Sequence, residues 1–190
     1  MQIFDITQEL FSGVVFPGDP KPLKNRVLSI SKGDTCNLTE FSACAHNATH
    51  LDAPCHFVDH GRSVAEMDLS KCLGQATVIH CDDVLSVNEV REVVRKGCKR
   101  LLIKGQGVIT LESARVMVES GIVLIGVEPQ TVGAGDEIVP IHQLLLGNEV
   151  VIVEGLVLEQ VPEGDYMLSA LPLKMSGSDG SPVRAVLYRE

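Results

Sequence analysis

The chain has 190 residues, of which 45% are hydrophobic and 22% are charged, and its net charge is −9. This length and composition are typical of a globular protein with a sizeable core, and we expect one domain over residues 1–190. Binding of nucleic acid needs a basic surface, so the acidic charge and the lack of a Lys/Arg block argue against that role.

Membrane insertion and secretion are not indicated by the sequence either. No segment approaches the ~20 consecutive apolar residues of a transmembrane helix. The start, "MQIFDITQEL", has acidic side chains where a signal peptide has a basic and then an apolar segment. The six cysteines form no C-x-x-C pair, which indicates reduced, mostly buried thiols. We therefore expect a cytoplasmic protein.

The first part of the chain is predicted to be β-structure. Residues 2–7 are predicted to form a strand, and "FPGDP" at 16–20 has the residues of a turn. Segments 25–33 and 37–46 alternate apolar and polar side chains, which predicts two half-buried strands.

From residue 76 onward, predicted strands alternate with predicted helices. Short apolar runs predict strands over 76–83, 100–105, 122–128 and 149–156. Helical spacing predicts helices over 86–97, 110–121 and 141–147. The end of the chain, 166–190, is predicted to form a hairpin that turns at Asp179–Gly180. This order of elements indicates a mixed α/β domain with a substantial sheet.

The stretch "HNATHLDAPCHF", residues 46–57, holds three of the six histidines together with one carboxylate. A straight strand would put His46 and His56 about 33 Å apart, and a helix would point Asp52 away from His50. A bend over residues 47–49, where small and turn-prone side chains stand, would fold His46 back beside His50 and Asp52. Mixed nitrogen and oxygen ligands suit zinc, manganese or iron. The alternative is a polar loop whose histidines only form hydrogen bonds.

Glu154 is a second candidate ligand. Val150–Val153 is an unbroken apolar run, typical of a strand that is buried on both faces. A carboxylate at the end of such a strand is costly to bury unless it is paired, and a metal ion is a suitable partner. The alternative is a solvated glutamate in the turn before Gly155.

The motif resembles the H-x-G-T-H-x-D-x-P-x-H-F signature of the cyclase family of metal-dependent hydrolases, which includes bacterial kynurenine formamidase and isatin hydrolase. The segments "FDITQEL", "FPGDP", "GIVLIGVE" and "ALPLKMSGSDGSPVRAV" resemble further parts of the family pattern, so the likeness runs from end to end. The resemblance implies an α/β domain with a mixed barrel-like sheet flanked by helices, of the swivelling β/β/α type.

The resemblance also implies roles for individual residues. The metal ligands would be His46, His50, Asp52 as a bridge between two ions, and the pair His142 and Glu154, which stand twelve positions apart. The cofactor would be one or two divalent ions per chain, zinc first and manganese second. His56 would be the general acid/base, and Phe16 would stack on the substrate.

The implied reaction is hydrolysis of a small N-formyl, N-acyl or cyclic amide by metal-activated water. Family members form homodimers or homotetramers in which the partner chain helps to close the pocket, so a homo-oligomer is expected. An adjacent Cys55–His56 pair could suggest a thiol protease, but neighbours on an extended chain point to opposite faces.

Three departures from the family pattern leave the substrate open. The glycine of G-T-H is Ala48, and the tryptophan before P-G-D is Phe16. The segment before residue 110 is short, and Glu128 replaces an aspartate where we expect substrate contacts. The alternatives are therefore kynurenine formamidase activity specifically, a lactone hydrolase with the same metals, or a non-catalytic metal-binding relative.

Overall fold

A computed structural model describes residues 1–190, and its main feature is a nine-stranded mixed sheet in the order β1-β13-β11-β5-β7-β9-β10-β4-β12. The strands are β1 Gln2–Asp5, β4 His50–Asp52, β5 Leu73–His80, β7 Arg100–Lys104, β9 Leu124–Val127, β10 Val151–Glu154, β11 Gly164–Ser169, β12 Gly180–Pro182 and β13 Val186–Arg189. The helices are α1 Val87–Arg95, α2 Leu111–Glu119 and α3 Ile138–Gly147. Strands β5, β7, β9 and β10 run parallel, and the remaining pairings are antiparallel.

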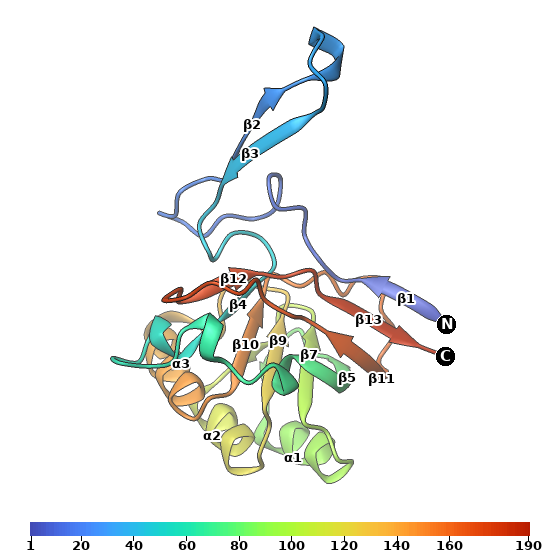
Figure 1. The fold of residues 1–190 in the computed structure, drawn as a ribbon. Helices are drawn as coiled ribbons and strands as arrows, with labels where there is room; N and C mark the ends of the chain where they lie inside the picture. The colour runs from blue at the N-terminus through green and yellow to red at the C-terminus, as the bar shows by residue number, and fades with distance from the viewer.

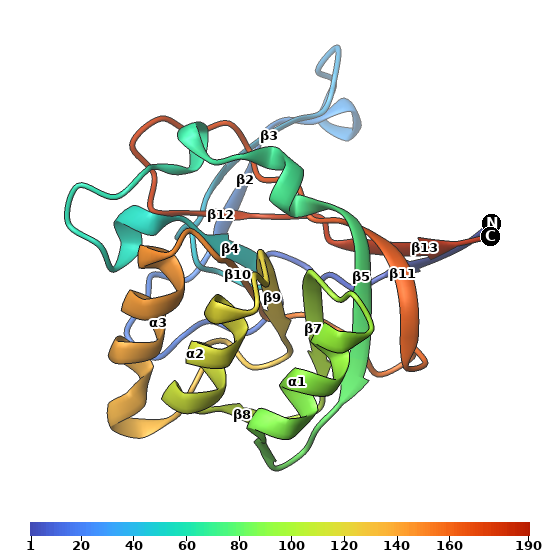
Figure 2. The same cartoon turned by 90° about the horizontal axis from the view of Figure 1, so that it is seen from below.

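The sheet curls, and the three helices pack side by side against one of its faces (Figures 1 and 2). Alternate residues of the central strands face the two sides. Leu101 and Ile103 of β7 pack with the helices, whereas Leu102 points into the core on the concave side, where it packs with Val78 and Leu187. Because both faces are covered, these strands are continuous apolar runs, as expected for buried parallel strands.

The expected mixed α/β fold with a barrel-like sheet is confirmed. The helices begin at the predicted caps: Ser86 and Thr110 each accept a hydrogen bond from the backbone N–H three residues later. Helix α3 starts three residues before the predicted position, because Pro140 is tolerated in its first turn. The cysteines are free, with three of them buried. No helix has the length and apolar content needed to cross a bilayer.

The prediction of two half-buried strands near the N-terminus is wrong about burial. Strands β2 (Leu23–Leu28) and β3 (Leu38–Ser42) pair as expected, but they form a separate hairpin that projects from the body (Figure 1). Nearly all of their residues are exposed. The register places Leu23 and Phe41 on opposite faces of the hairpin, and both side chains remain largely exposed although Phe41 packs edge-on against Phe11. We call residues 21–42 the arm.

The C-terminal hairpin is more complex than expected. Strands β11 and β13 do pair, but β12 lies between them in the chain and pairs instead with β4. The prediction of a turn at Asp179–Gly180 is wrong, because Gly180 begins β12 and the turn lies at Ser176–Gly177. Asp179 thus lies at the other edge of the sheet, beside the histidine-rich segment. A short two-stranded sheet of β6 (Val84–Leu85) and β8 (Val108–Ile109) completes the fold.

Gly155, directly after β10, is expected to tolerate no side chain. Its φ is +69°, and an added Cβ would lie 2.5 Å from the Ala48 carbonyl oxygen. Gly177 has a similar φ of +73° with open space around it. In both alanine variants the left-handed conformation costs ~1–2 kcal/mol of strain. We expect the free energy of unfolding of Gly155→Ala to fall by a further ~1–3 kcal/mol, because the added methyl group overpacks the site. Urea unfolding in the presence of a chelator measures the free energy of unfolding of both variants. Equal losses in Gly155→Ala and Gly177→Ala would contradict the close approach of Gly155 to Ala48.

Candidate metal centre

A sharp bend before β4 returns His46 to the neighbourhood of His50. Asn47 Oδ1 accepts a hydrogen bond from Cys44 N, and Ala48 then adopts a φ of +56°. The His46 and His50 rings consequently lie 5.1 Å apart between centroids. The bend forms at the expected residues, and the alanine takes up a left-handed conformation that favours glycine.

The pairing of β4 brings the second acidic residue to the same place. In the register with β10, His50 lies opposite Glu154, and such pairs project from the same face of a sheet. Asp52 is two residues further along β4 and shares that face. His50 Nε2 lies 3.3 Å from Glu154 Oε2 and 3.5 Å from Asp52 Oδ1. All three side chains are almost fully buried.

Helix α3 covers this face and contributes His142. Its Nε2 lies 3.3 Å from Glu154 Oε1 and 3.7 Å from Asp52 Oδ2. The Glu154 carboxylate also accepts a hydrogen bond from Val132 N at 2.8 Å. Phe57 stacks on the His142 ring at 4.4 Å and forms one wall of the group.

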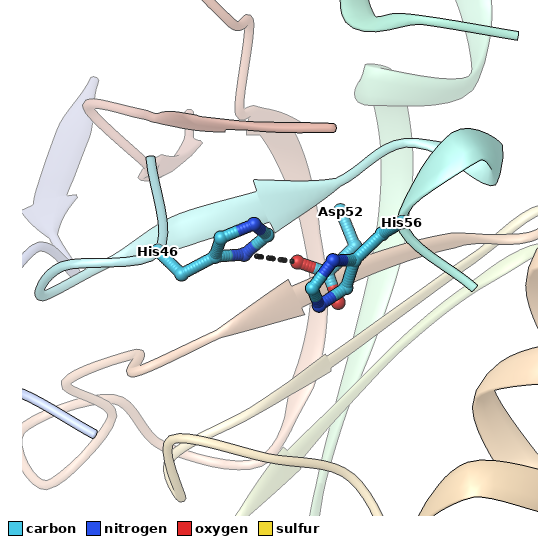
Figure 3. A group of neighbouring side chains, drawn as sticks. All are labelled: His46, Asp52 and His56. Carbon is cyan, nitrogen blue, oxygen red and sulfur yellow. Dashed lines mark hydrogen bonds and ion pairs between the residues drawn. The ribbon is translucent and has the colours of Figure 1, made fainter. Parts of the chain in front are cut away.

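His46 and His56 are the more exposed imidazoles of the group, and Figure 3 shows both beside Asp52. Their rings stack with centroids 4.1 Å apart, and His46 Nδ1 lies 3.0 Å from Asp52 Oδ1. The Asp179 carboxylate lies 3.3 Å from both His46 Nε2 and His56 Nδ1. The His56 side chain is 27% exposed, so it is the member of this group of imidazoles most open to an incoming molecule.

The buried residues fit a divalent cation. Two overlapping groups have ligand atoms within 4.8 Å of one another, and both contain Asp52: one with His46 and His56, the other with His50 and Glu154. Asp52 Oδ2 is buried without a hydrogen-bond partner. The Nδ1 atoms of His50 and His142 face the carbonyl oxygens of Ala48 and Ile138, which directs each Nε2 toward the carboxylates. A hydrogen bond from the second ring nitrogen to a carbonyl oxygen is typical of histidines that bind metals.

The pKa values of the histidines reflect the two buried carboxylates beside them. Burial alone would lower the pKa of His46, but the hydrogen bond and charge of Asp52 raise it to about 9. For His50 and His142 burial is likewise outweighed, chiefly by Glu154, and their pKa values are raised. Burial lowers the pKa of His56. A bound cation would take over the balancing charge from the imidazoles.

Six of the seven residues singled out from the sequence therefore meet: His46, His50, Asp52, His56, His142 and Glu154. Phe16 lies outside the cluster, 40% exposed, and its role stays a prediction. Two neighbours were missed. Phe57 is the last residue of the motif, and nothing in the local sequence distinguishes it from a core residue. The sequence around Asp179 predicts only a turn, since no local pattern indicates that its loop reaches the histidines.

Glu128 does not match the expectation of a substrate contact. Its carboxylate accepts hydrogen bonds from Gly105 N at 2.6 Å and from Leu158 N at 2.7 Å. It thus joins the loop after β7 to the chain after β10. This glutamate holds backbone segments together.

Comparisons with known proteins agree with this geometry. The model of the Cyclase family matches residues 4–134. The chain is 33% identical to kynurenine formamidase of Polaromonas naphthalenivorans (strain CJ2), over 98% of this chain and 91% of the relative. It is 32% identical to kynurenine formamidase of Bacillus anthracis, over 96% and 95%.

Solved structures share the fold. Isatin hydrolase A from Labrenzia aggregata, bound to benzyl benzoate, superposes with a TM-score of 0.83 at 23% identity, over 98% of this chain and 93% of the other. A potential metal-dependent hydrolase with cyclase activity gives a TM-score of 0.83 at 24% identity, over 100% and 98%. At these identities the structures establish the fold alone.

Because Asp52 belongs to both groups of ligand atoms, its charge is expected to control metal binding. Loss of a residue that hydrogen-bonds to a metal ligand typically lowers metal affinity by roughly 10–100-fold. We expect Asp52→Asn to lower it by more, because Asp52 itself is a proposed ligand. The matched control is Asp59→Asn, since Asp59 pairs only with the exposed His60. Elemental analysis after zinc or manganese loading and competition with a chelator measure the effect. Equal metal content in both variants would contradict a site centred on Asp52.

Proposed function

The chain belongs to the cyclase family of metal-dependent hydrolases and is an amide hydrolase, and we propose that the buried cluster around Asp52 is its catalytic centre. The reaction proposed is cleavage of a small N-formyl, N-acyl or cyclic amide. The observation that carries the proposal is the adjacency of a buried mixed nitrogen and oxygen ligand set to a partly exposed imidazole, His56. The whole chain, 1–190, is proposed to act as one catalytic domain.

The residues proposed to hold the metal are His46, His50, Asp52, His142 and Glu154. When bound, the cation would supply Lewis acidity that activates water and polarises the amide carbonyl. Asp52 is proposed to bridge, because both of its carboxylate oxygens face imidazole nitrogens from different elements. We propose zinc first and manganese second, in one or two equivalents per chain, since histidine and carboxylate donors suit either ion.

His56 is proposed to move the proton. Its Nδ1 faces Asp179, and no hydrogen bond occupies its other nitrogen, which therefore remains available to a reacting group. Hydrolysis of an amide requires a proton from water to reach the departing nitrogen, and an imidazole can accept and then donate it. Half-buried Phe57 lies edge-on to the His56 ring and stacks on buried His142, so these two rings form one wall beside His56.

A more specific candidate is kynurenine formamidase activity, conversion of N-formylkynurenine to kynurenine and formate. Relatives at 33% and 32% identity bear that name. The aromatic ring of such a substrate would stack on exposed Phe16 or on half-buried Phe57, the last residue of the motif. Assays of N-formylkynurenine, a simple formanilide and isatin at equal concentration separate the specific activity from broader amide hydrolysis. Turnover of none of them by metal-loaded protein would overturn the proposed function.

His56→Ala is expected to retain metal and lose turnover. Removal of a general acid/base typically lowers kcat by about 10²–10⁴-fold. The matched control is His60→Ala, because His60 is 94% exposed and pairs only with Asp59. Steady-state kinetics with a formamide substrate, together with metal analysis, measure both properties. A near-normal kcat in His56→Ala would exclude this role.

We also propose a homo-oligomer, with a dimer as the smallest unit, in which the arm contacts a second copy. The arm exposes several large apolar side chains: Leu23, Val27, Ile30, Leu38 and Phe41. It also carries four basic and two acidic residues, although the whole chain has a net charge of −9. The apolar, basic arm of one copy is complementary to the acidic body of a second copy. In a two-fold symmetric dimer this contact between arm and body occurs twice.

Charges on the arm are expected to dissociate this assembly. Wild-type protein should have roughly twice the 20.5 kDa mass of one chain, or a multiple of it. Leu23→Glu with Phe41→Glu should shift it to the monomer, because buried glutamates are costly. Val84→Glu with Val139→Glu is the control, with the same added charge at exposed positions outside the arm. Light scattering during gel filtration reads out the mass, and a monomeric wild type would refute the proposal.

A further inference from the structure

Asp179 is the one acidic side chain that touches both of the more exposed imidazoles. Its Oδ2 lies 3.3 Å from His46 Nε2 and 3.3 Å from His56 Nδ1. The carboxylate is 49% exposed, whereas Asp52 and Glu154 are buried. It therefore lies at the rim of the centre and not among the buried ligands.

The main chain holds Asp179 in this position. Its carbonyl oxygen accepts a hydrogen bond from Ala53 N at 2.8 Å, and the carbonyl of Ser178 accepts one from Val64 N at 2.9 Å. The next residue, Gly180, lies opposite Asp52 in the pairing of β12 with β4. A Cβ on Gly180 would lie 2.5 Å from the His46 ring, so the loop packs directly against that imidazole. The carboxylate is placed by backbone contacts that do not involve its side chain.

The four histidines of the centre obtain their orientation in two different ways. His50 and His142 each direct Nδ1 to a backbone carbonyl, of Ala48 and Ile138 respectively. His46 and His56 have no backbone acceptor on either ring nitrogen. For His46, Nδ1 faces Asp52 and Nε2 faces Asp179. Asp179 is thus the side chain that contacts both imidazoles lacking a backbone acceptor, at 3.3 Å in each case, and His46 Nε2 forms no hydrogen bond with another group.

We propose that Asp179 is a positioning residue that fixes the ring orientation and tautomer of both His46 and His56. The inference rests on the proposed function of the site. The carboxylate lies 3.3 Å from His56 Nδ1 and so favours the proton on that nitrogen, which leaves the lone pair that receives a proton on Nε2. Contact with Nε2 of His46 leaves Nδ1 directed toward Asp52 and any cation held there. The Asp179 carboxylate would therefore orient both the proposed metal ligand His46 and the proposed general acid/base His56.

Kinetics of a double-mutant cycle test this coupling. With metal saturating, Asp179→Ala should lower kcat by about 10–100-fold, the usual cost of losing such a partner, with little change in KM. In the His56→Ala background the same change should cost less than about threefold, because residues that act through one another are not additive. Asp59→Asn is the control and should leave kcat unchanged. An equal loss in both backgrounds, or no loss at all, would overturn the proposal.

A readout that needs no turnover separates failure of this inference from failure of the proposed function. In zinc-loaded protein with ¹⁵N-labelled histidine, long-range ¹H–¹⁵N spectra distinguish the two neutral tautomers. The His56 signal is assigned by its loss in His56→Ala. Wild-type His56 should carry its proton on Nδ1, and Asp179→Ala should convert it to a mixture. An unchanged tautomer would refute the role of Asp179 even if amides are hydrolysed, and the predicted change would support it even if none is.

Discussion

The structure depends on two carboxylates, Asp52 and Glu154, that are almost completely buried beside an apolar core. Burial of an unpaired ionised carboxylate costs several kcal/mol. Each of these two side chains must therefore face positive charge or hydrogen-bond donors. Imidazoles from residues 46–56 and from helix α3 meet that requirement. Although burial acts to raise the pKa of Asp52, His46, His50 and His56 hold it below its usual value. A cation bound between Asp52 and Glu154 would balance the same negative charge, and fewer of the neighbouring imidazoles would then need to be protonated. The need to compensate this charge explains why the histidines cluster here.

The position of β4 between β10 and β12 determines which side chains meet. Antiparallel pairing places His50 opposite Glu154 and Asp52 opposite Gly180. A slip of one residue would turn His50 and Asp52 to the other face of the sheet, into the concave core. Tight backbone approaches keep the register, because Gly155 packs on Ala48 and Gly180 packs on the His46 ring. The metal centre and the edge of the sheet are thus specified together.

The arm and the body meet the hydrophobic requirement differently. In the body, curling of the sheet and the three helices (Figure 2) cover both faces of the central strands, so the apolar runs of β7, β9 and β10 are buried within one chain. The arm projects from the body (Figure 1), and its large apolar side chains stay exposed. This difference is why oligomerisation is proposed from the arm alone and why the body needs no partner to form its core.

Local sequence patterns predicted most of the elements, the bend at 47–49 and the members of the buried cluster that are proposed as ligands. Apolar runs and caps such as Ser86 depend on neighbouring residues, and the spacing of His46, His50 and Asp52 permits a compact group only if the chain bends at 47–49. Tertiary structure alone decided the rest. Exposure of the arm and the arrival of Asp179 beside His56 depend on pairings and packing between segments far apart in the chain. Such long-range pairing leaves no periodic signal in the local sequence.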